Sequence, residues 1–253
     1  MSPAFDTNGV WLVTGCSAGL GQSIARHVYA AGHNIVATAR NVDSLDYLPD
    51  GPKVLKLSLD VTSRERITAA VNSTHSKEMH SIMQGNVNAT SCYLWRQRRF
   101  LMEWLCSKFA LEGLTKSVNR ELNPKWNIKL MILSPGGVKT KFASNMRFLP
   151  RHPAYDNDEA PLTGLSKYIK IPSSADTWAD ADKCAAVLFD VVLGQKDKPL
   201  PTRLNLGADA LPLMRHEIGE YLREMEDWEE ETLKVMPSTT ESSVLVDQLI
   251  KGF

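Results

Sequence analysis

A glycine-punctuated turn near the N-terminus has the spacing of a phosphate-binding loop. An apolar run at residues 10–13 leads into three glycines and then into a helical pattern; the glycines are Gly15, Gly19 and Gly21. Gly15 allows a tight turn, Gly19 lets the backbone approach a pyrophosphate, and Gly21 lets the helix pack closely. Free N–H groups and the dipole at the helix start would bind a diphosphate. The stretch predicts a dinucleotide-binding loop, with an ordinary turn as the alternative.

The end of the second predicted strand favours NADP(H) over NAD(H). This strand, residues 34–39, ends at Arg40, where a Rossmann-like fold meets the adenosine ribose. An acidic residue there would repel a 2′-phosphate, whereas a guanidinium binds phosphate through charge-assisted hydrogen bonds. Ser17 in the glycine loop is a further donor. The alternative is a solvated arginine at a strand end.

The pattern Thr-Gly-x-x-x-Gly-x-Gly at residues 14–21 resembles the short-chain dehydrogenase/reductase family. The resemblance covers residues 8–75 and 104–235. It implies an α/β fold with a Rossmann-like, doubly wound parallel sheet, in a single NAD(P)-binding domain over residues 1–253. It also implies an NADP(H)-dependent oxidoreductase of the carbonyl reductase or alcohol dehydrogenase type, acting on a small-molecule carbonyl or alcohol. The cofactor-binding residues implied are Gly15, Ser17, Gly19, Leu20, Gly21, Arg40, Asp60, Lys108, Val138 and Thr140.

Residues 104–113 resemble the family's Tyr-x-x-Ser-Lys-Phe-Ala-x-x-Gly motif. In that motif the tyrosine passes a proton to or from the substrate oxygen, and the lysine ammonium lowers the tyrosine pKa. The resemblance makes Lys108 a catalytic residue and a ligand of the nicotinamide ribose. Trp104 occupies the tyrosine position, and an indole N–H cannot act as a general acid. Ser91, at the family's spacing before Trp104, is the second implied catalytic residue, whereas Tyr93 is not held near Lys108 by any local geometry.

Two further segments match cofactor contacts of the family. The third strand, residues 54–59, stops at Asp60, which would accept from the adenine amino group, cap the following helix, or do both. The segment 134–140 resembles the family's Pro-Gly-x-x-x-Thr. There the backbone beside Val138 and the Thr140 hydroxyl would hold the nicotinamide carboxamide, with a plain Pro-Gly turn as the alternative.

Hydrophobic spacing predicts the elements that position these residues. We expect one helix over 63–76, a second that contains Lys108 and ends at about 122, and a third over 179–193. Strands are expected at 128–133 and 203–207. Residues 143–175 are rich in Pro, Asp, Asn and Ser and predict a lid or substrate loop, and residues 237–253 predict a polar tail. The stripes expected on these helices are Ile24, Val28 and Ala31; Ile67, Ala70 and Val71; Ala110, Leu114 and Val118; and Met214, Ile218, Tyr221, Leu222, Met225 and Trp228.

The family pattern stops after His75. The family would show a strand ending in Asn-Asn-Ala-Gly, a long helix and a strand ending in the catalytic serine, but residues 81–90 make a poor buried strand with Asn88-Ala89 as a remnant. We therefore expect the sheet to lack central elements. Two interpretations follow. One is an active oxidoreductase of a secondary-metabolite, lipid or steroid pathway, because the ending Leu-Gly-x-Asp at residues 206–209, before the last helix, resembles the larger fungal-type members of the family. The other is a cofactor-binding but catalytically impaired, truncated or mis-spliced family member, with residues 77–103 out of frame.

Composition excludes several other classes. Lys+Arg and Asp+Glu number 29 each, so nothing global points to nucleic acid, and the basic run at residues 95–100 is interpreted as a solvated helix face. No apolar run is long enough for a membrane span and no signal pattern precedes the first strand, so we expect a cytoplasmic location. A homo-oligomer is compatible with these features. The scattered, reduced cysteines predict no metal site; they are Cys16, Cys92, Cys106 and Cys184.

Overall fold

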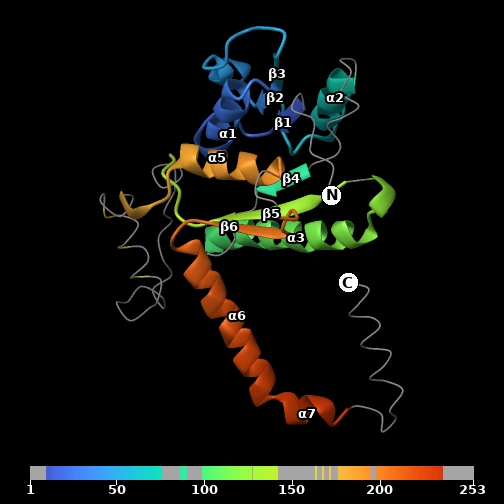
Figure 1. Cartoon of the computed structure of the whole chain (residues 1–253), viewed down its shortest axis with the longest axis vertical. Helices are drawn as coiled ribbons and strands as arrows, with labels where there is room; N and C mark the ends of the chain where they lie inside the picture. Colours follow the sequence, from blue (N-terminus) through green and yellow to red (C-terminus); the bar gives the residue numbers. More distant parts are fainter. Residues whose placement is uncertain are drawn as a thin grey trace.

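The computed structural model describes residues 10–75, 86–89, 99–126, 128–141, 163, 167, 171, 176–194 and 198–235. Within these residues the chain forms a Rossmann-like α/β fold of parallel strands covered by helices (Figure 1). The predicted lid at 143–175 and tail at 237–253 lie almost wholly outside the described residues, as do Ser91, Tyr93 and Cys92.

The N-terminal half is a three-stranded parallel sheet. It consists of β1 (Val10–Val13), β2 (Asn34–Ala39) and β3 (Val54–Ser58), with β2 in the middle. Helix α1 (Gly19–Ala30) joins β1 to β2, the 3-10 helix η1 (Val42–Leu45) lies between β2 and β3, and α2 (Arg64–His75) follows β3. From Ile35 to Ala39 every residue of β2 is buried, as expected for a central parallel strand covered on both faces.

The second half is another three-stranded parallel sheet. Here β5 (Leu130–Pro135) lies between β4 (Asn86–Ala89) and β6 (Arg203–Leu206). Helix α3 (Arg99–Glu121), followed by η3 (Pro124–Trp126), covers one face, and α5 (Ala181–Val192) covers the other. Side chains of a strand alternate between faces, so Met131 and Leu133 pack with α5, whereas Ser134 faces α3.

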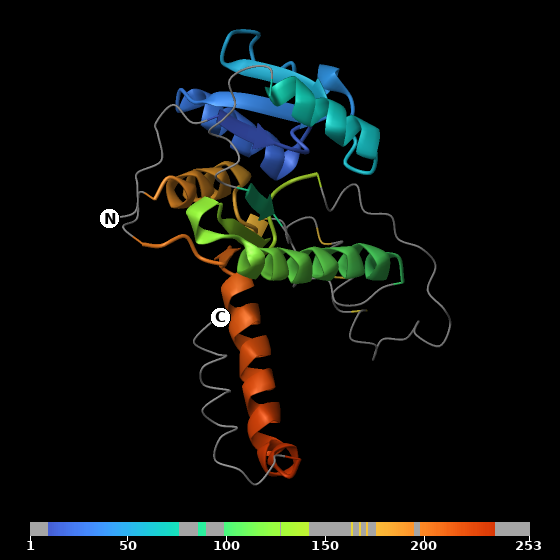
Figure 2. The same ribbon diagram turned by 90° about the vertical axis from the view of Figure 1, so that its right-hand side faces the viewer.

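Helix α5 connects the two halves of the core (Figure 2). Its Phe189 packs into the cluster of α1 and β2 and stacks on Trp11, with the ring centroids 5.3 Å apart. On the same helix, Cys184 and Leu188 pack against β5 and β6. One helix is therefore buried against both sheets.

The described strands do not form one continuous sheet. Neither β1 nor β4 pairs with a described strand on its second edge, and Leu12 in the middle of β1 is 42% exposed. Along the chain, the change from one sheet to the other comes between β3 and β4, the interval in which the sequence loses the family pattern after His75. Within the stretch expected to make a poor buried strand, Asn86–Ala89 does pair with β5, because parallel backbone pairing needs no apolar side chains.

Several predicted helix faces were wrong. In α3 the side buried against the sheet carries Glu112 and Thr115, while Ala110 is exposed and Leu114 is 59% exposed. In α2, Ala70 is buried but Ile67 is exposed. Helical spacing locates a stripe but not the layer that covers it, and no described helix covers the side of α3 that carries Leu114.

Smaller differences concern element ends. The predicted strand at 128–133 runs from Leu130 to Pro135. In α1, Ala31 is an exposed C-cap residue and not part of the buried stripe, which includes Ala25 instead.

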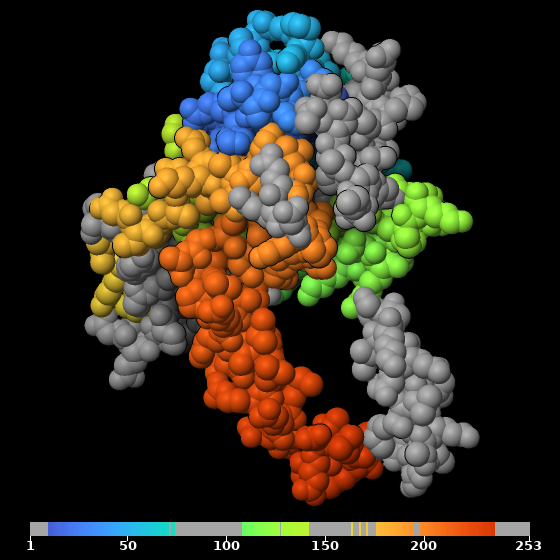
Figure 3. Space-filling view, in the orientation of Figure 1, coloured from blue at the N-terminus to red at the C-terminus, as the bar shows by residue number. Residues whose placement is uncertain are grey.

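The last helices extend away from the body of the molecule (Figure 3). They are α6 (Ala210–Asp227) and the short α7 (Glu229–Leu233). Only the first turns of α6 are buried, through Ala210 and Met214. The rest of the predicted apolar stripe is exposed; its members are Ile218, Tyr221, Leu222, Met225 and Trp228.

Candidate cofactor and active site

The glycine loop has the backbone geometry that a phosphate loop needs. Gly19 has a positive φ of 64°, a conformation that side chains disfavour. A Cβ on Gly21 would come within 2.5 Å of the Gly15 carbonyl oxygen, so only glycine allows α1 to start this close to β1. The predicted packing role of Gly21 agrees with this geometry, and the approach of Gly19 to a pyrophosphate stays a prediction.

The N-terminus of α1 is open to an anion. Its N-cap residue is Ala18, no side chain caps it, and its first turn contains no acidic residue. By contrast, α5 and α6 are capped by the carboxylates of Asp180 and Asp209. The first N–H groups of α1 thus remain for a ligand, and the helix dipole favours a negative one. The residues present fit a dinucleotide pyrophosphate at this position.

The loop is braced from behind by Cys16 and Tyr47. The Cys16 backbone N–H donates to the Thr38 carbonyl at 2.9 Å, and the Tyr47 hydroxyl donates to the Cys16 carbonyl at 2.9 Å. Burial raises the pKa of the Cys16 thiol to about 11. The pKa of Tyr47 is also raised, mainly by burial and to a lesser degree by the nearby Cys16. Both groups stay protonated and serve as hydrogen-bond donors. Sequence reasoning missed Tyr47 because no local pattern pairs it with the loop.

A basic edge lies at the carboxyl ends of β2 and β3. Arg40 is exposed there, and its carbonyl accepts from the Ser58 hydroxyl at 3.1 Å. The same Ser58 oxygen accepts from Arg66 Nη1 at 3.3 Å. The backbone of Arg40 and the guanidinium of Arg66 therefore lie beside one serine, although the sequence pointed to Arg40 alone. Arg66 was missed because only the packing of α2 against β3 brings it to this edge.

Asp60 lies at the same edge and begins the connection to α2. Its Oδ1 accepts from the Thr62 backbone N–H at 3.0 Å and from the Thr62 hydroxyl at 2.7 Å. These bonds, and to a lesser degree Arg40 and Arg66, hold the pKa of the Asp60 carboxyl below its usual value. Asp60 therefore forms a turn ahead of α2, whereas the Arg66 backbone N–H in the first turn of that helix donates to Ser63 Oγ at 3.3 Å. The predicted helix cap by Asp60 was wrong, because the helix begins only after Ser63, and the adenine contact stays a prediction.

The segment after β5 meets the glycine loop. A Cβ placed on Gly19 would lie 3.2 Å from both Cβ and Cγ2 of Thr140. The predicted phosphate contact and the predicted carboxamide contact, far apart in the sequence, are therefore adjacent in space. Their closeness defines a path along which a dinucleotide can lie.

This segment is fixed by hydrogen bonds from three directions. The Gly136 N–H donates to the Leu206 carbonyl at 2.7 Å, and the Gly137 N–H donates to Asp209 Oδ2 at 2.7 Å. The Ala179 N–H donates to the Gly137 carbonyl at 2.8 Å, and the Lys139 N–H donates to the Ala179 carbonyl at 2.9 Å. We call residues 136–140 the carboxamide loop. Asp209 was seen in the sequence only as part of a Leu-Gly-x-Asp ending.

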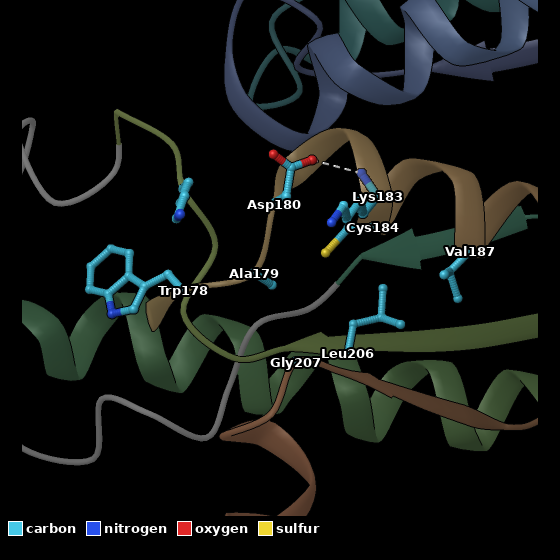
Figure 4. A pocket seen from close by; sticks show the side chains of 9 residues that line it. Trp178, Ala179, Asp180, Lys183, Cys184, Val187, Leu206 and Gly207 are labelled. Atoms are coloured by element: carbon cyan, nitrogen blue, oxygen red, sulfur yellow. Dashed lines mark hydrogen bonds between the residues drawn. The ribbon is translucent and has the colours of Figure 1, made fainter. Parts of the chain in front are cut away.

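A shallow hollow of about 400 Å³ lies beside the carboxamide loop (Figure 4). Lys139 and Trp178 line it from the loop side, and Asp180, Lys183 and Cys184 line it from α5. Figure 4 shows Trp178 and Leu206 on opposite sides of Gly207. Lys139 therefore borders this hollow, while its neighbour Thr140 meets the glycine loop.

Helix α3 carries the predicted catalytic lysine. Lys108 is half-buried and lies one turn before the buried Glu112, on the side of α3 that faces the sheet. Arg203 in β6 donates to Glu112 through Nη1 at 3.0 Å and through Nη2, and to Ser134 Oγ at 2.7 Å. This buried network joins α3 to both strands. Trp104 is in α3 one turn before Lys108, and its side chain lies outside the described residues, as does the whole of Ser91.

In the described part of the chain, no helix is long and apolar enough to cross a membrane. The described His, Cys, Asp and Glu residues form no group that could hold a metal ion.

Comparison with known proteins shows the family. The family model described as short chain dehydrogenase matches residues 9–84. Oxidoreductase calM of Penicillium decumbens is 30% identical over 277 aligned residues, covering 87% of this chain and 90% of the relative. An uncharacterized oxidoreductase, C162.03, of Schizosaccharomyces pombe is 30% identical over 265, covering 83% and 87%. Both alignments are longer than this 253-residue chain, so both include positions of the relative that have no counterpart here.

A similar fold is found in a short-chain dehydrogenase from Streptomyces avermitilis. The TM-score is 0.73 at 24% identity, covering 91% of this chain and 99% of that one. The family binds nicotinamide dinucleotides, NAD(H) or NADP(H), and acts on small molecules. The uncapped start of α1, the Gly19–Thr140 contact and these similarities together show that the chain belongs to the short-chain dehydrogenase family of oxidoreductases.

Proposed function

We propose that this chain binds NADP(H) and uses it to interconvert a small carbonyl compound and its alcohol. The observation that carries the proposal is the contact between Thr140 and Gly19, because it brings the carboxamide loop against the phosphate loop. With its pyrophosphate on the start of α1, a dinucleotide would reach the carboxamide loop with its nicotinamide end.

The preference for NADP(H) rests on the basic edge. Arg66 Nη1 donates to Ser58 Oγ, the Arg40 backbone accepts from the same hydroxyl, and the charges of both arginines act on Asp60. Two guanidinium groups would thus be available at the edge where a 2′-phosphate would be bound. Ser17 in the exposed part of the glycine loop is a further donor. Asp60 keeps Oδ2 for the adenine amino group, since the hydrogen bonds that it accepts within the described chain reach Oδ1.

The remaining residues would prepare the reacting centre. The bound cofactor supplies or accepts the hydride. The Thr140 hydroxyl and the backbone beside Val138 orient the carboxamide, Lys108 binds the nicotinamide ribose, and Ser91 donates a hydrogen bond to the substrate oxygen. Proton transfer is the weak step, because Trp104 replaces the tyrosine of the motif and its indole N–H does not ionise in the physiological range.

This weak step favours a second candidate function. A chain with an intact cofactor site and no general acid would bind NADP(H) and turn over poorly. Titration with NADPH together with a carbonyl reduction assay separates the two candidates. Tight binding with turnover supports the oxidoreductase, and tight binding without turnover supports a catalytically impaired family member. For either, we propose a role in the cytoplasm and in secondary, lipid or steroid metabolism, from the resemblance to the larger fungal-type members.

The cofactor proposal is tested by fluorescence titration of Arg40→Asp with NADPH and NADH. We expect the preference for NADPH to fall by about 1 to 3 kcal/mol, the value of a charge-assisted phosphate contact. Arg223→Asp is the matched control, since it makes the same charge change on α6, where Arg223 pairs with Glu220. An unchanged preference in Arg40→Asp would contradict the assignment of the 2′-phosphate to this edge.

A further inference from the structure

We propose that Asp209 is a positioning residue for the nicotinamide half of the cofactor. This proposal rests on the proposed function, because it concerns the carboxamide loop of that site. The Asp209 carboxylate lies in the turn between β6 and α6 and binds the loop that follows β5.

The two carboxylate oxygens bind different elements. Oδ1 accepts from the Ala210 backbone N–H at 3.0 Å and caps α6. Oδ2 accepts from the Gly137 backbone N–H at 2.7 Å, across 72 positions of sequence. One side chain therefore links the start of α6 to the carboxamide loop.

The carboxylate is closely enclosed by glycine backbone. A Cβ on Gly136 would overlap the carboxylate of Asp209, and a Cβ on Gly207 would lie 2.8 Å from Oδ1. The Gly136 N–H donates to the Leu206 carbonyl at 2.7 Å, which holds the same turn from the other side. The loop thus has little freedom to shift while Asp209 stays in place.

Capping alone does not explain this arrangement. Asp180 caps α5, and the N–H groups that it accepts, from Asp182 at 3.0 Å and Lys183 at 2.9 Å, both belong to that helix. Asp209 instead uses one of its oxygens on a loop outside its helix. Because Gly137 directly precedes Val138, loss of this bond frees the backbone that would hold the carboxamide.

The position of Asp209 predicts an effect on only one half of the cofactor. No hydrogen bond in the described chain joins Asp209 to the glycine loop or to the basic edge at Arg40. The adenosine half, bound at those places, should be insensitive to Asp209. The ligand 2′,5′-ADP contains that half and lacks nicotinamide, so it separates a local effect on the carboxamide loop from a general loss of structure.

Two variants remove the loop bond in different ways. In Asp209→Asn, the side chain keeps one acceptor oxygen for one of the two backbone N–H groups, of Ala210 and Gly137, and points an amide donor at the other. In Asp209→Ser, the hydroxyl still caps α6 but is too short to reach Gly137. Glu220→Gln is the matched control, since it makes the same acid-to-amide change on α6, where Glu220 pairs with Arg223. Binding of NADPH and of 2′,5′-ADP is measured for each full-length variant.

We expect both Asp209 variants to bind NADPH about 5- to 30-fold more weakly and to bind 2′,5′-ADP unchanged, whereas Glu220→Gln binds both normally. Equal weakening of both ligands would overturn the proposal by showing a general structural role, and unchanged NADPH binding would show that Asp209 only caps α6. If the unaltered chain binds neither ligand, the proposed function itself is wrong, and the role of Asp209 is overturned with it.

Discussion

Replacing Glu112 by Gln should destabilise the fold more than any single surface change. The side chains of Glu112 and Arg203 are only 6% and 15% exposed, and both guanidinium nitrogens Nη1 and Nη2 bind the Glu112 carboxylate. Gln removes the negative charge and one acceptor oxygen, so the buried Arg203 charge faces a neutral amide in place of a carboxylate. Breaking a buried ion pair in this way costs about 3 to 5 kcal/mol, a large share of the roughly 5 to 15 kcal/mol that stabilises a typical domain.

Urea unfolding followed by circular dichroism measures this cost. Glu220→Gln is the control, because Glu220 pairs with Arg223 at 2.9 Å with both side chains at least half exposed. Such a pair contributes at most about 1 kcal/mol. The double variant Glu112→Leu/Arg203→Met should recover much of the loss, since no buried charge then lacks a partner.

The same variant tests how Lys108 is positioned. Lys108 is one turn before Glu112 in α3, and the Glu112–Arg203 pair holds this helix against β5 and β6. We expect the fraction of the Glu112→Gln variant that stays folded to bind NADPH more weakly than the unaltered chain does. A cost below about 1 kcal/mol, equal to that of Glu220→Gln, would refute the reasoning by showing that water screens the pair.

Two further predictions concern the reaction and the glycine loop. Trp104→Tyr should raise carbonyl reduction at least about ten-fold, because it supplies a general acid, and Lys108→Ala should abolish the gain; robust NADPH oxidation by the unaltered chain, insensitive to Lys108→Ala, would mean that another group supplies the proton. For Cys16, burial raises the thiol pKa from 9.0 to about 11, so the folded chain holds this proton more tightly than the unfolded chain. Its contribution is complete below pH 9 and is lost as the pH rises through 11, a fall of up to about 2.7 kcal/mol in the free energy of unfolding. Urea midpoints at pH 8 and pH 10.5 should show a smaller fall in Cys16→Ser, and equal falls in both proteins would contradict burial as the cause.

Local patterns predicted the fold class and the first half of the cofactor site. The apolar strands at Val10–Val13 and Asn34–Ala39, and the glycine spacing between them, depend on backbone geometry and on contacts within one βαβ unit. Such features are written in consecutive residues, so the sequence alone locates them. The expected parallel α/β architecture is confirmed, and the two three-stranded sheets are not paired with each other in the described part of the chain.

The buried face of α3 was decided only by tertiary packing. The sequence placed Ala110 and Leu114 in the core by their spacing, yet the structure buries Glu112, because Arg203 and Ser134 from distant strands satisfy its charge. A stripe of apolar residues predicts burial only if a neighbouring layer exists to cover it. The same reason leaves the stripe of α6 exposed beyond Met214.

The predicted cofactor site shows the same division between what the sequence determines and what tertiary structure determines. The sequence determined that Gly19, Arg40 and Thr140 have the types and spacings to bind a dinucleotide. Tertiary structure alone placed Thr140 against Gly19, Arg66 beside Ser58, Tyr47 behind the phosphate loop and Asp209 beneath the carboxamide loop. Each of these contacts joins separate elements of the fold. Their geometry depends on how helices and strands pack together, which is not encoded in the spacing of residues along any one of them.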